Sequence, residues 1–288
     1  MGHARDRYLW RLLVPWLALL GACSAAVEPP AGPPAQISNV AISGGHSCAL
    51  DPLGDVHCWG DGMPAEPAPE GSGFTQVGVA KDFACALERM GRVRCWGQEP
   101  QYLSVPSDNF VKLAVGPWHA CGIREDGSLS CWVGLMGSDP VRDPPAGRFV
   151  EVAIGSDHAC AIRAGSGEVA CWGKGYHGET QAPGGAFVKL CAGVFFSCGI
   201  RVDETLDCWG SNRNSALGFP SGKYKEVACM HEACAIAEDG HIECWTTAVG
   251  LPPEGEFSQV SCGFRSTQCC AVGTDSKLAC WSWDPSGP

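Results

Sequence analysis

The sequence is poor in the groups from which active sites are built. It has no Gly-x-Ser-x-Gly elbow, no His-Glu-x-x-His pair, no phosphate-binding loop and no recurrent pair of carboxylates. Charged residues make up only 18%, with 20 basic against 31 acidic residues and a net charge of −11. An acidic surface of this kind argues against binding nucleic acid or anionic lipid. We therefore expect no catalytic residue, no cofactor and no metal, and favour a binding protein.

Turn-forming residues and cysteine are abundant instead. The 288 residues include 38 Gly, 21 Pro, 19 Cys and 11 Trp, a composition that excludes a helical bundle and an ordinary cytosolic enzyme. Hydrophobic residues make up 45%, so most of the chain is able to fold around a core. The composition predicts an all-β protein of an oxidising compartment.

The N-terminus has the pattern of an export signal. Arg5, Arg7 and Arg11 precede the apolar run 12–20, which is too short to span a bilayer. The run ends in Leu-Gly-Ala-Cys at residues 20–23, which resembles the bacterial lipobox. That resemblance implies a signal peptide over 1–22 and a lipid on Cys23. The alternative is a plain signal peptide with a chance cysteine near its cleavage site.

Residues 23–36 follow as a tether. They contain four prolines and no hydrophobic periodicity, which is typical of an extended, semi-rigid spacer. Ser24 follows the cysteine, and by resemblance to lipoprotein sorting it would permit transfer to the outer membrane of a Gram-negative cell. The leader carries three Arg and one Asp, so its removal takes the net charge from −11 to −13. We expect a monomer in the cell envelope that touches the membrane only through this anchor.

Seven tandem units fill residues 37–288. The dipeptide Cys-Trp recurs with successive tryptophans 36 to 40 residues apart, at Cys58, Cys95, Cys131, Cys171, Cys208, Cys244 and Cys280. Each unit begins with a short apolar segment such as 152–155, which reads as a strand packed on both faces. A hairpin follows, with Asp126-Gly127 or Asp239-Gly240 as its turn.

The cysteines of each hairpin face one another. Every Cys-Trp cysteine has a counterpart ten or eleven residues upstream, at Cys48, Cys85, Cys121, Cys160, Cys198, Cys234 and Cys270. Counting inward from the turn places the two on opposed positions of antiparallel strands, about 4.5 Å apart at Cα. We therefore predict seven hairpin disulfides. Zinc is the weaker alternative, since the chain has no Cys-x-x-Cys pair.

Four further cysteines stand outside this pattern: Cys191, Cys229, Cys262 and Cys269. Cys191 and Cys229 occupy first-strand positions of consecutive units, with side chains on opposite faces, so they are able to meet between neighbouring units. Cys262 and Cys269 flank an insertion and are able to close a small loop. Free buried thiols are the alternative for all four.

The unit resembles the regulator of chromosome condensation repeat. The pattern of a small residue, Gly, x-x-His-x-Cys and Cys-Trp-Gly is clearest at 44–50, 116–121 and 155–160. The resemblance implies a seven-bladed β-propeller of four-stranded blades, and the paired cysteines look like the secreted bacterial branch of the family. The last unit is short of an outer strand, which residues 31–36 are able to supply. A guanine-nucleotide exchange activity like that of the nuclear relative is a third, weaker hypothesis, because export separates the protein from its GTPase.

His46, His119 and His158 occupy one repeated position, which is Phe83 and Phe196 in two other units. A catalytic base is not exchangeable with phenylalanine, so we interpret these histidines as structural. A lyase or hydrolase acting on a polysaccharide or small molecule stays open as an alternative, because a fold does not fix a function.

The loop between the first and second strand of each unit varies most, and all seven loops are expected at one end of the propeller. By resemblance, such loops dock protein partners, and large aromatic, Met and Arg side chains anchor interfaces. We predict an unidentified extracytoplasmic protein as the partner. The candidate binding residues are Asp82, Trp118, Asp157, Phe195, Met230, His231, Phe264 and Arg265. For Trp118 and Phe195 the alternative is that they cap the core of a blade.

Overall fold

A computed structural model describes residues 34–60, 67–97, 105–133, 140–211, 221–231, 233–245, 251–264 and 268–282. Cys23 and the signal peptide lie outside these residues, as do Arg265 and the last six residues. The described part contains no helix of the length and apolarity that crossing a membrane requires.

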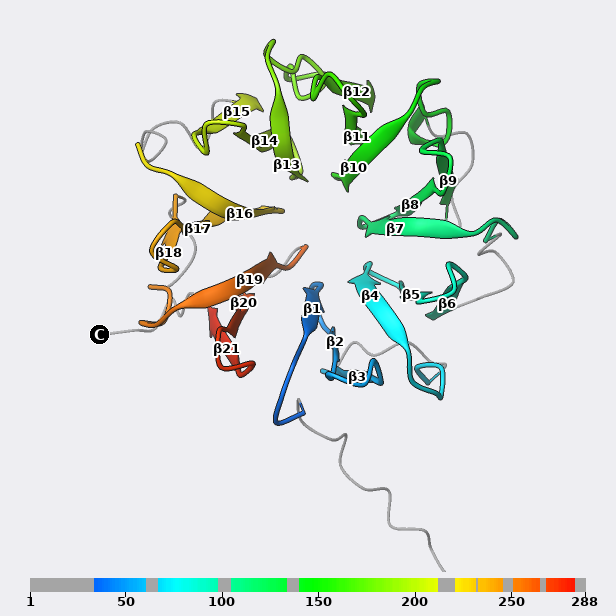
Figure 1. Cartoon of the computed structure of the whole chain (residues 1–288), viewed down its shortest axis with the longest axis vertical. Coiled ribbons are helices and arrows are strands. Elements are labelled where there is room, and N and C mark those ends of the chain that lie inside the picture. Colours follow the sequence, from blue (N-terminus) through cyan, green and yellow to red (C-terminus); the bar gives the residue numbers. More distant parts are fainter. Residues whose placement is uncertain are drawn as a thin grey trace, which may run out of the picture.

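Seven antiparallel sheets stand around a central axis (Figure 1), which confirms the seven-bladed propeller. Each sheet, or blade, has three strands, and the first strand of each lies nearest the axis. The blades are numbered in chain order. Blade 1 contains β1 (Asn39–Ile42), β2 (Ser47–Leu50) and β3 (Val56–Trp59); blade 2 contains β4 (Phe74–Val79), β5 (Phe83–Glu88) and β6 (Val93–Gly97); blade 3 contains β7 (Phe110–Val115), β8 (His119–Arg124) and β9 (Leu129–Val133); blade 4 contains β10 (Phe149–Ile154), β11 (His158–Arg163) and β12 (Val169–Gly173). Blade 5 contains β13 (Phe187–Ala192), β14 (Phe196–Arg201) and β15 (Leu206–Gly210); blade 6 contains β16 (Tyr224–Cys229), β17 (Ala233–Ala237) and β18 (Ile242–Cys244); and blade 7 contains β19 (Phe257–Cys262), β20 (Gln268–Gly273) and β21 (Leu278–Ser282).

The expectation of four strands per blade is wrong for the described residues, where every sheet has three. Before blade 4 the connection forms a short 3₁₀ turn, η2 (Pro140–Arg142), whose Val141 carbonyl accepts a hydrogen bond from Trp172 Nε1 at 2.8 Å. Trp209 Nε1 binds the Glu179 carbonyl in the same way at 2.8 Å. Proline has no amide hydrogen to donate to a ladder, and 140–145 contains three prolines. The tryptophans therefore hold these connections in place of strand pairing.

The hairpin disulfides are confirmed in all seven blades, with Cα atoms 4.0 to 4.1 Å apart. In blade 4 the two cysteines are 11 residues apart in sequence instead of 10. The additional residue lies in the turn, so Cys160 still faces Cys171. Gly127 has a φ of 85°, the left-handed conformation that the Asp126-Gly127 turn requires.

Neighbouring blades join through a bulky residue at the start of each inner strand. This residue is buried, and its amide donates to a carbonyl in the preceding hairpin turn, as from Phe110 to Gly91 at 2.7 Å. The equivalents are Phe74, Phe149, Phe187, Tyr224 and Phe257. In blade 1 the position is held by Ile37, whose amide donates to Ser276 of blade 7 at 2.7 Å. Of the segment 31–36 that was expected to supply an outer strand, residues 31–33 lie outside the described residues and 34–36 form no strand, so this seam takes part in closing the ring.

Polar side chains of the inner strands add a second seam contact. Gln76 Oε1 accepts from the Leu113 amide at 2.7 Å, and Gln259 Oε1 accepts from the Val40 amide at 3.1 Å across the closure. Lys112 pairs with Glu151, and Lys189 with Glu226, at equivalent positions of other blades. Because each pair joins particular neighbours, the contacts favour one order of blades.

The two ends of the propeller differ in structure. Inner strands start beside the hairpin turns and end beside the variable loops, as the pairs Phe74 with Glu88 and Val79 with Ala84 show for blade 2. We call the end with the turns the hairpin face. The end with the loops between first and second strands is the loop face.

Candidate functional site

Three rings from different blades meet on the loop face. Trp118 of blade 3 packs edge-on against Phe264 of blade 7, with ring centroids 5.9 Å apart. His231 of blade 6 stacks on the same Phe264 at 5.6 Å. Blades 3 and 7 are not neighbours in the ring (Figure 1), so this contact crosses the loop end of the central axis. Trp118, His231 and Phe264 are called the aromatic cluster below.

The members of the aromatic cluster differ in exposure. Phe264 is buried at 6% exposure, Trp118 is half-buried and His231 is exposed. Phe264 is thus the base of the cluster and not the exposed anchor that its residue type suggested. Trp118 and His231 present the surface that a partner is able to reach.

Charged groups at the rim neutralise one another. Lys81 Nζ lies 5.4 Å from the centroid of the Trp118 ring and 3.2 Å from Asp82 Oδ2. On blade 4, Lys174 Nζ lies 3.0 Å from Asp157 Oδ1. Exposed pairs of this kind contribute little to stability. Their effect is to leave an aromatic surface with balanced charge.

A second aromatic contact lies on the loops of blades 4 and 5. Phe195 is 44% exposed and meets His177 edge-on, with centroids 5.0 Å apart. The Val194 amide donates to the Met230 carbonyl at 2.9 Å, which ties the blade 5 loop to the blade 6 loop. Phe195 therefore does not cap a blade core but stays open to solvent.

Two disulfides outside the hairpin pattern support these loops. Cys191 is bonded to Cys229, linking the inner strands of blades 5 and 6 with Cα atoms 5.3 Å apart. Cys262 is bonded to Cys269 within blade 7, with Cα atoms 4.1 Å apart. Cys229 immediately precedes Met230, and Cys262 lies two residues before Phe264. Both additional bonds thus occur where the candidate binding residues lie.

The predicted site residues lie at three places on the loop face, except for one that is outside the described residues. Trp118, His231 and Phe264 come together, while Asp82 joins them through Lys81. Phe195 and Met230 lie on adjoining loops, and Asp157 is paired with Lys174. Arg265 lies outside the described residues. Sequence reasoning missed His177 because it follows a Cys-Trp segment, where no repeat pattern indicated which end of the blade it would reach.

A buried hydroxyl–imidazole pair lies between blades 4 and 5. His158 Nε2 is 2.7 Å from Ser197 Oγ, and both residues have 0% exposure. Burial lowers the pKa of His158 to about 4, so the ring is neutral at physiological pH. Glu179 does not complete a triad, because its carboxylate accepts from the His177 amide at 2.6 Å. The pair is out of reach of a substrate, in keeping with a structural role.

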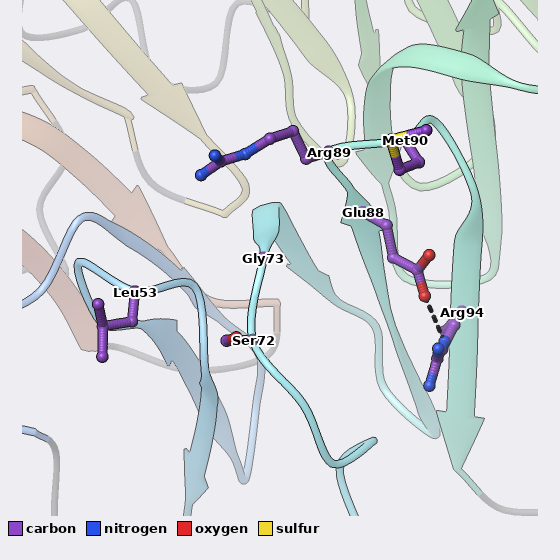
Figure 2. Close-up of a pocket in the computed structure, with 7 residues that line it drawn as sticks. All are labelled: Leu53, Ser72, Gly73, Glu88, Arg89, Met90 and Arg94. Carbon is purple, nitrogen blue, oxygen red and sulfur yellow. Dashed lines mark ion pairs between the residues drawn. The ribbon is translucent and has the colours of Figure 1, made fainter.

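A shallow notch of about 380 Å³ lies on the hairpin face between the turns of blades 1 and 2 (Figure 2). Leu53 of blade 1 lines it, with Arg89, exposed Met90 and the ion pair of Glu88 with Arg94 from blade 2. The described residues that line it include no aromatic ring and no disulfide. We use its exposed apolar residues as controls below.

Comparison with known proteins agrees with this architecture. Residues 149–179, which comprise blade 4 and the connection after it, match the Regulator of chromosome condensation (RCC1) repeat. The chain is similar to the ectodomain of the receptor kinase CR4 from Physcomitrella patens, with 22% identity over 86% of this chain and 73% of that one and a TM-score of 0.73. The CRINKLY WD40 ectodomain of the Arabidopsis thaliana receptor kinase ACR4 gives 21% identity, 86% and 95% coverage, and a TM-score of 0.72.

A third β-propeller is also similar. The β-propeller domain of Cps50 (Swd1) from Myceliophteria thermophila has 12% identity, coverage of 88% of this chain and 99% of that one, and a TM-score of 0.58. At such identities the likeness shows the fold alone.

Proposed function

We propose that this propeller of regulator of chromosome condensation (RCC1) repeats is a binding scaffold that works outside the cytoplasm, held to a membrane through Cys23. Its loop face recognises a protein partner and performs no chemistry. The aromatic cluster supports this proposal most directly, because three blades contribute to it and two additional disulfides lie beside it.

Preorganisation explains why such a surface binds. Loops that are already fixed lose little conformational entropy when a partner docks. Here Cys191–Cys229 and Cys262–Cys269 restrain the loops that carry Met230, His231 and Phe264. Half-buried Trp118 provides a large apolar surface with few rotatable bonds, as interface anchors do.

The balanced rim charges suit a protein partner better than a polyanion. Lys81 and Lys174 are each engaged by an aspartate, so the described loop face offers no cluster of free cations for phosphate groups. The overall charge of −11 adds a repulsive field toward nucleic acid. An uncharged aromatic centre with a polar rim is the usual anatomy of a protein interface.

The disulfides support a compartment outside the cytosol. Nine disulfide bonds join described cysteines, and such bonds persist outside the reducing cytosol. The described chain starts at residue 34 and reaches the ring at Ile37, which binds Ser276 in a turn of the hairpin face. A tether from Cys23 would therefore attach at the hairpin face and leave the loop face free for a partner.

Replacing Cys23 by Ala tests the anchor. We expect the Cys23→Ala protein to lose incorporation of radiolabelled palmitate and to move from the membrane fraction to the soluble fraction. A Ser24→Ala variant, which keeps the thiol, serves as the control and is expected to stay labelled. Label that is unchanged in Cys23→Ala would show that Cys23 is not the lipid attachment site.

The loop face is tested by comparing two double variants. Envelope proteins are crosslinked to the wild-type protein, and each captured protein is then titrated against purified variants. We expect Trp118→Ala/His231→Ala to weaken binding of a true partner at least about tenfold, since removing an interface anchor changes affinity by about that factor or more. Leu53→Ala/Met90→Ala, on the notch of the hairpin face, is expected to bind like wild type. If both double variants bound equally more weakly than wild type, or only Leu53→Ala/Met90→Ala did, the partner would not bind on the loop face.

A further inference from the structure

Blade 5 differs from the other blades in its row of cysteines. Cys191 of β13 lies opposite Cys198 of β14, which lies opposite Cys208 of β15. Directly opposed side chains of antiparallel strands lie on the same face, so three cysteines cross the sheet in one row. The residues at the position of Cys191 in the other six blades are Ala41, Gly78, Ala114, Ala153, Ala228 and Ser261.

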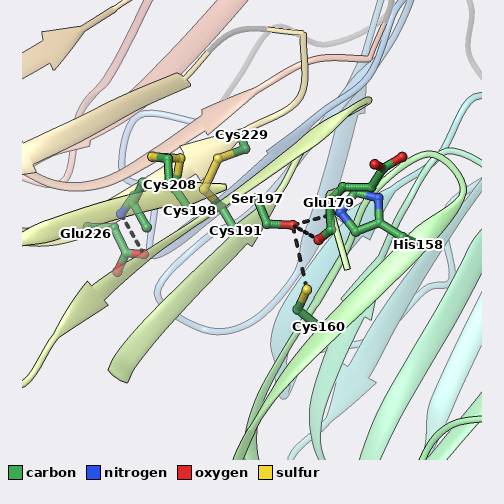
Figure 3. The surroundings of a disulfide bond; sticks show 10 residues. His158, Cys160, Glu179, Cys191, Ser197, Cys198, Cys208, Glu226 and Cys229 are labelled. Carbon is green, nitrogen blue, oxygen red and sulfur yellow. Dashed lines mark hydrogen bonds between the residues drawn. A yellow bond between two sulfur atoms is a disulfide. The ribbon is translucent and has the colours of Figure 1, made fainter. Parts of the chain in front are cut away.

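Two disulfides meet at this row. Cys198 is bonded to Cys208 within blade 5, and Cys191 is bonded to Cys229 of blade 6. The sulfur atoms of Cys191, Cys198 and Cys229 all lie within 4.8 Å of one another. Figure 3 shows the two bonds side by side, with Cys198 next to Cys191. Since each sulfur is in a disulfide, the group does not present the thiolates that a zinc ion binds.

Accessibility differs between the two bonds. Cys198 is fully buried, and Cys191 and Cys229 are 6% and 7% exposed, whereas Cys208 on the outer strand is half-buried. A thiol in solution therefore reaches the Cys208 sulfur first. Attack there leaves the electron pair on Cys198, which is the inner sulfur of the row.

The geometry points to a thiol–disulfide relay, in which reduction of the Cys198–Cys208 bond is followed by cleavage of the Cys191–Cys229 bond between blades. In the first step a low-molecular-weight thiol, as its thiolate, bonds to Cys208 and releases Cys198 as a thiolate. Cys198 then attacks Cys191, the Cys191–Cys198 bond forms, and the electron pair leaves on Cys229, which takes up a proton. A second thiol then displaces Cys208 from its mixed disulfide with the first. Two thiols are thereby oxidised to one small-molecule disulfide, and the protein has one disulfide bond fewer.

Proximity favours the second step. The attacking and attacked sulfurs are held within 4.8 Å by a sheet, so the step is intramolecular and needs no diffusion of a second molecule. Cys191 and Cys198 are also direct cross-strand partners in the register of β13 and β14. The product bond therefore joins two residues that already lie opposite one another in the sheet.

The relay would act on the loop face. The new Cys191–Cys198 bond stays within blade 5, so blades 5 and 6 lose their covalent link. Cys229 precedes Met230 and His231, whose loop would then be linked to the blade 5 loop by non-covalent contacts such as the hydrogen bond from Val194 to Met230. This consequence for binding rests on the proposed function, whereas the exchange of bonds does not.

Partial reduction followed by mapping of the thiols tests the relay. The purified protein is treated with limiting glutathione, quenched in acid, denatured, alkylated and analysed by peptide mass spectrometry. We expect label on Cys208 and Cys229, with Cys229 labelled at least about tenfold more than Cys198, together with a Cys191–Cys198 crosslinked peptide. Cys121–Cys131 is the control within the same molecule: Ala114 stands beside it, so its label should divide equally between Cys121 and Cys131.

Equal labelling of Cys198 and Cys208 with the Cys191–Cys229 bond intact would overturn the relay. A Cys208→Ser variant gives a second measurement, since it leaves Cys198 without its hairpin partner. We expect its free thiol to be Cys229, and a free thiol at Cys198 would also contradict the proposal. No partner is present in either experiment, so failure here leaves the test of the loop face unaffected.

Discussion

Acidification from pH 7 to pH 4 is expected to destabilise the folded protein by about 3 kcal/mol through His158 alone. Burial lowers the pKa of this imidazole from 6.5 to about 4, although the carboxylates of Glu179 and Asp157 act in the opposite direction. In the unfolded chain the same ring takes up a proton below about pH 6.5. The unfolded state therefore binds the extra proton, so this stability is present above pH 6.5 and is lost as the pH falls to about 4.

The pH dependence of unfolding in urea, measured for wild type and for His158→Phe/Ser197→Ala, checks this. This double variant introduces the residue types that two other seams between blades carry at the same positions. Phe83 packs with Ala120 between blades 2 and 3, and Phe196 packs with Ala233 between blades 5 and 6. We expect it to lose about 3 kcal/mol less than wild type between pH 7 and pH 4. His241→Phe, in an exposed turn, controls for removal of an imidazole. Parallel pH curves for wild type and the double variant would show that His158 does not set the acid sensitivity.

The ring of blades was predictable because local signals recur. The spacing of Cys58-Trp59 and its six equivalents determines the number of units, and the opposed hairpin cysteines determine the register of two strands in each. Both are properties of residues close in sequence, and the structure agrees. That the described sheets have three strands and not four was not predictable, because the connections have no repeated pattern and their prolines favour turns such as η2 over a ladder.

The candidate site was only partly predictable. The repeat places Trp118, His231 and Phe264 at the same end of three blades, which is why the sequence could nominate them. That Trp118 reaches Phe264 across the axis depends on the side-chain directions of loops from blades 3 and 7. The burial of Phe264 has the same origin. Neither follows from a residue type or a spacing.

Removing the link between blades 5 and 6 is expected to have the largest effect on stability. The Cys191–Cys229 bond closes a loop of 38 residues, against 10 for Cys121–Cys131. By loop entropy the longer crosslink contributes about 4 kcal/mol and the shorter about 3 kcal/mol. Cys191→Ala/Cys229→Val introduces the residues that blade 3 carries at these positions, Ala114 and Val115, so little core volume should be lost.

Denaturant unfolding of the two double variants under oxidising conditions measures the difference. We expect Cys191→Ala/Cys229→Val to be less stable than wild type by about 4 kcal/mol, and Cys121→Ala/Cys131→Ala by about 3 kcal/mol. An equal loss of stability in the two variants, or a larger loss in the second, would contradict the loop-entropy account of the link between blades. In that case the additional disulfide would serve the position of the Met230 and His231 loop and not the closure of the ring, and partner binding would fall in the first variant without a matching loss of stability.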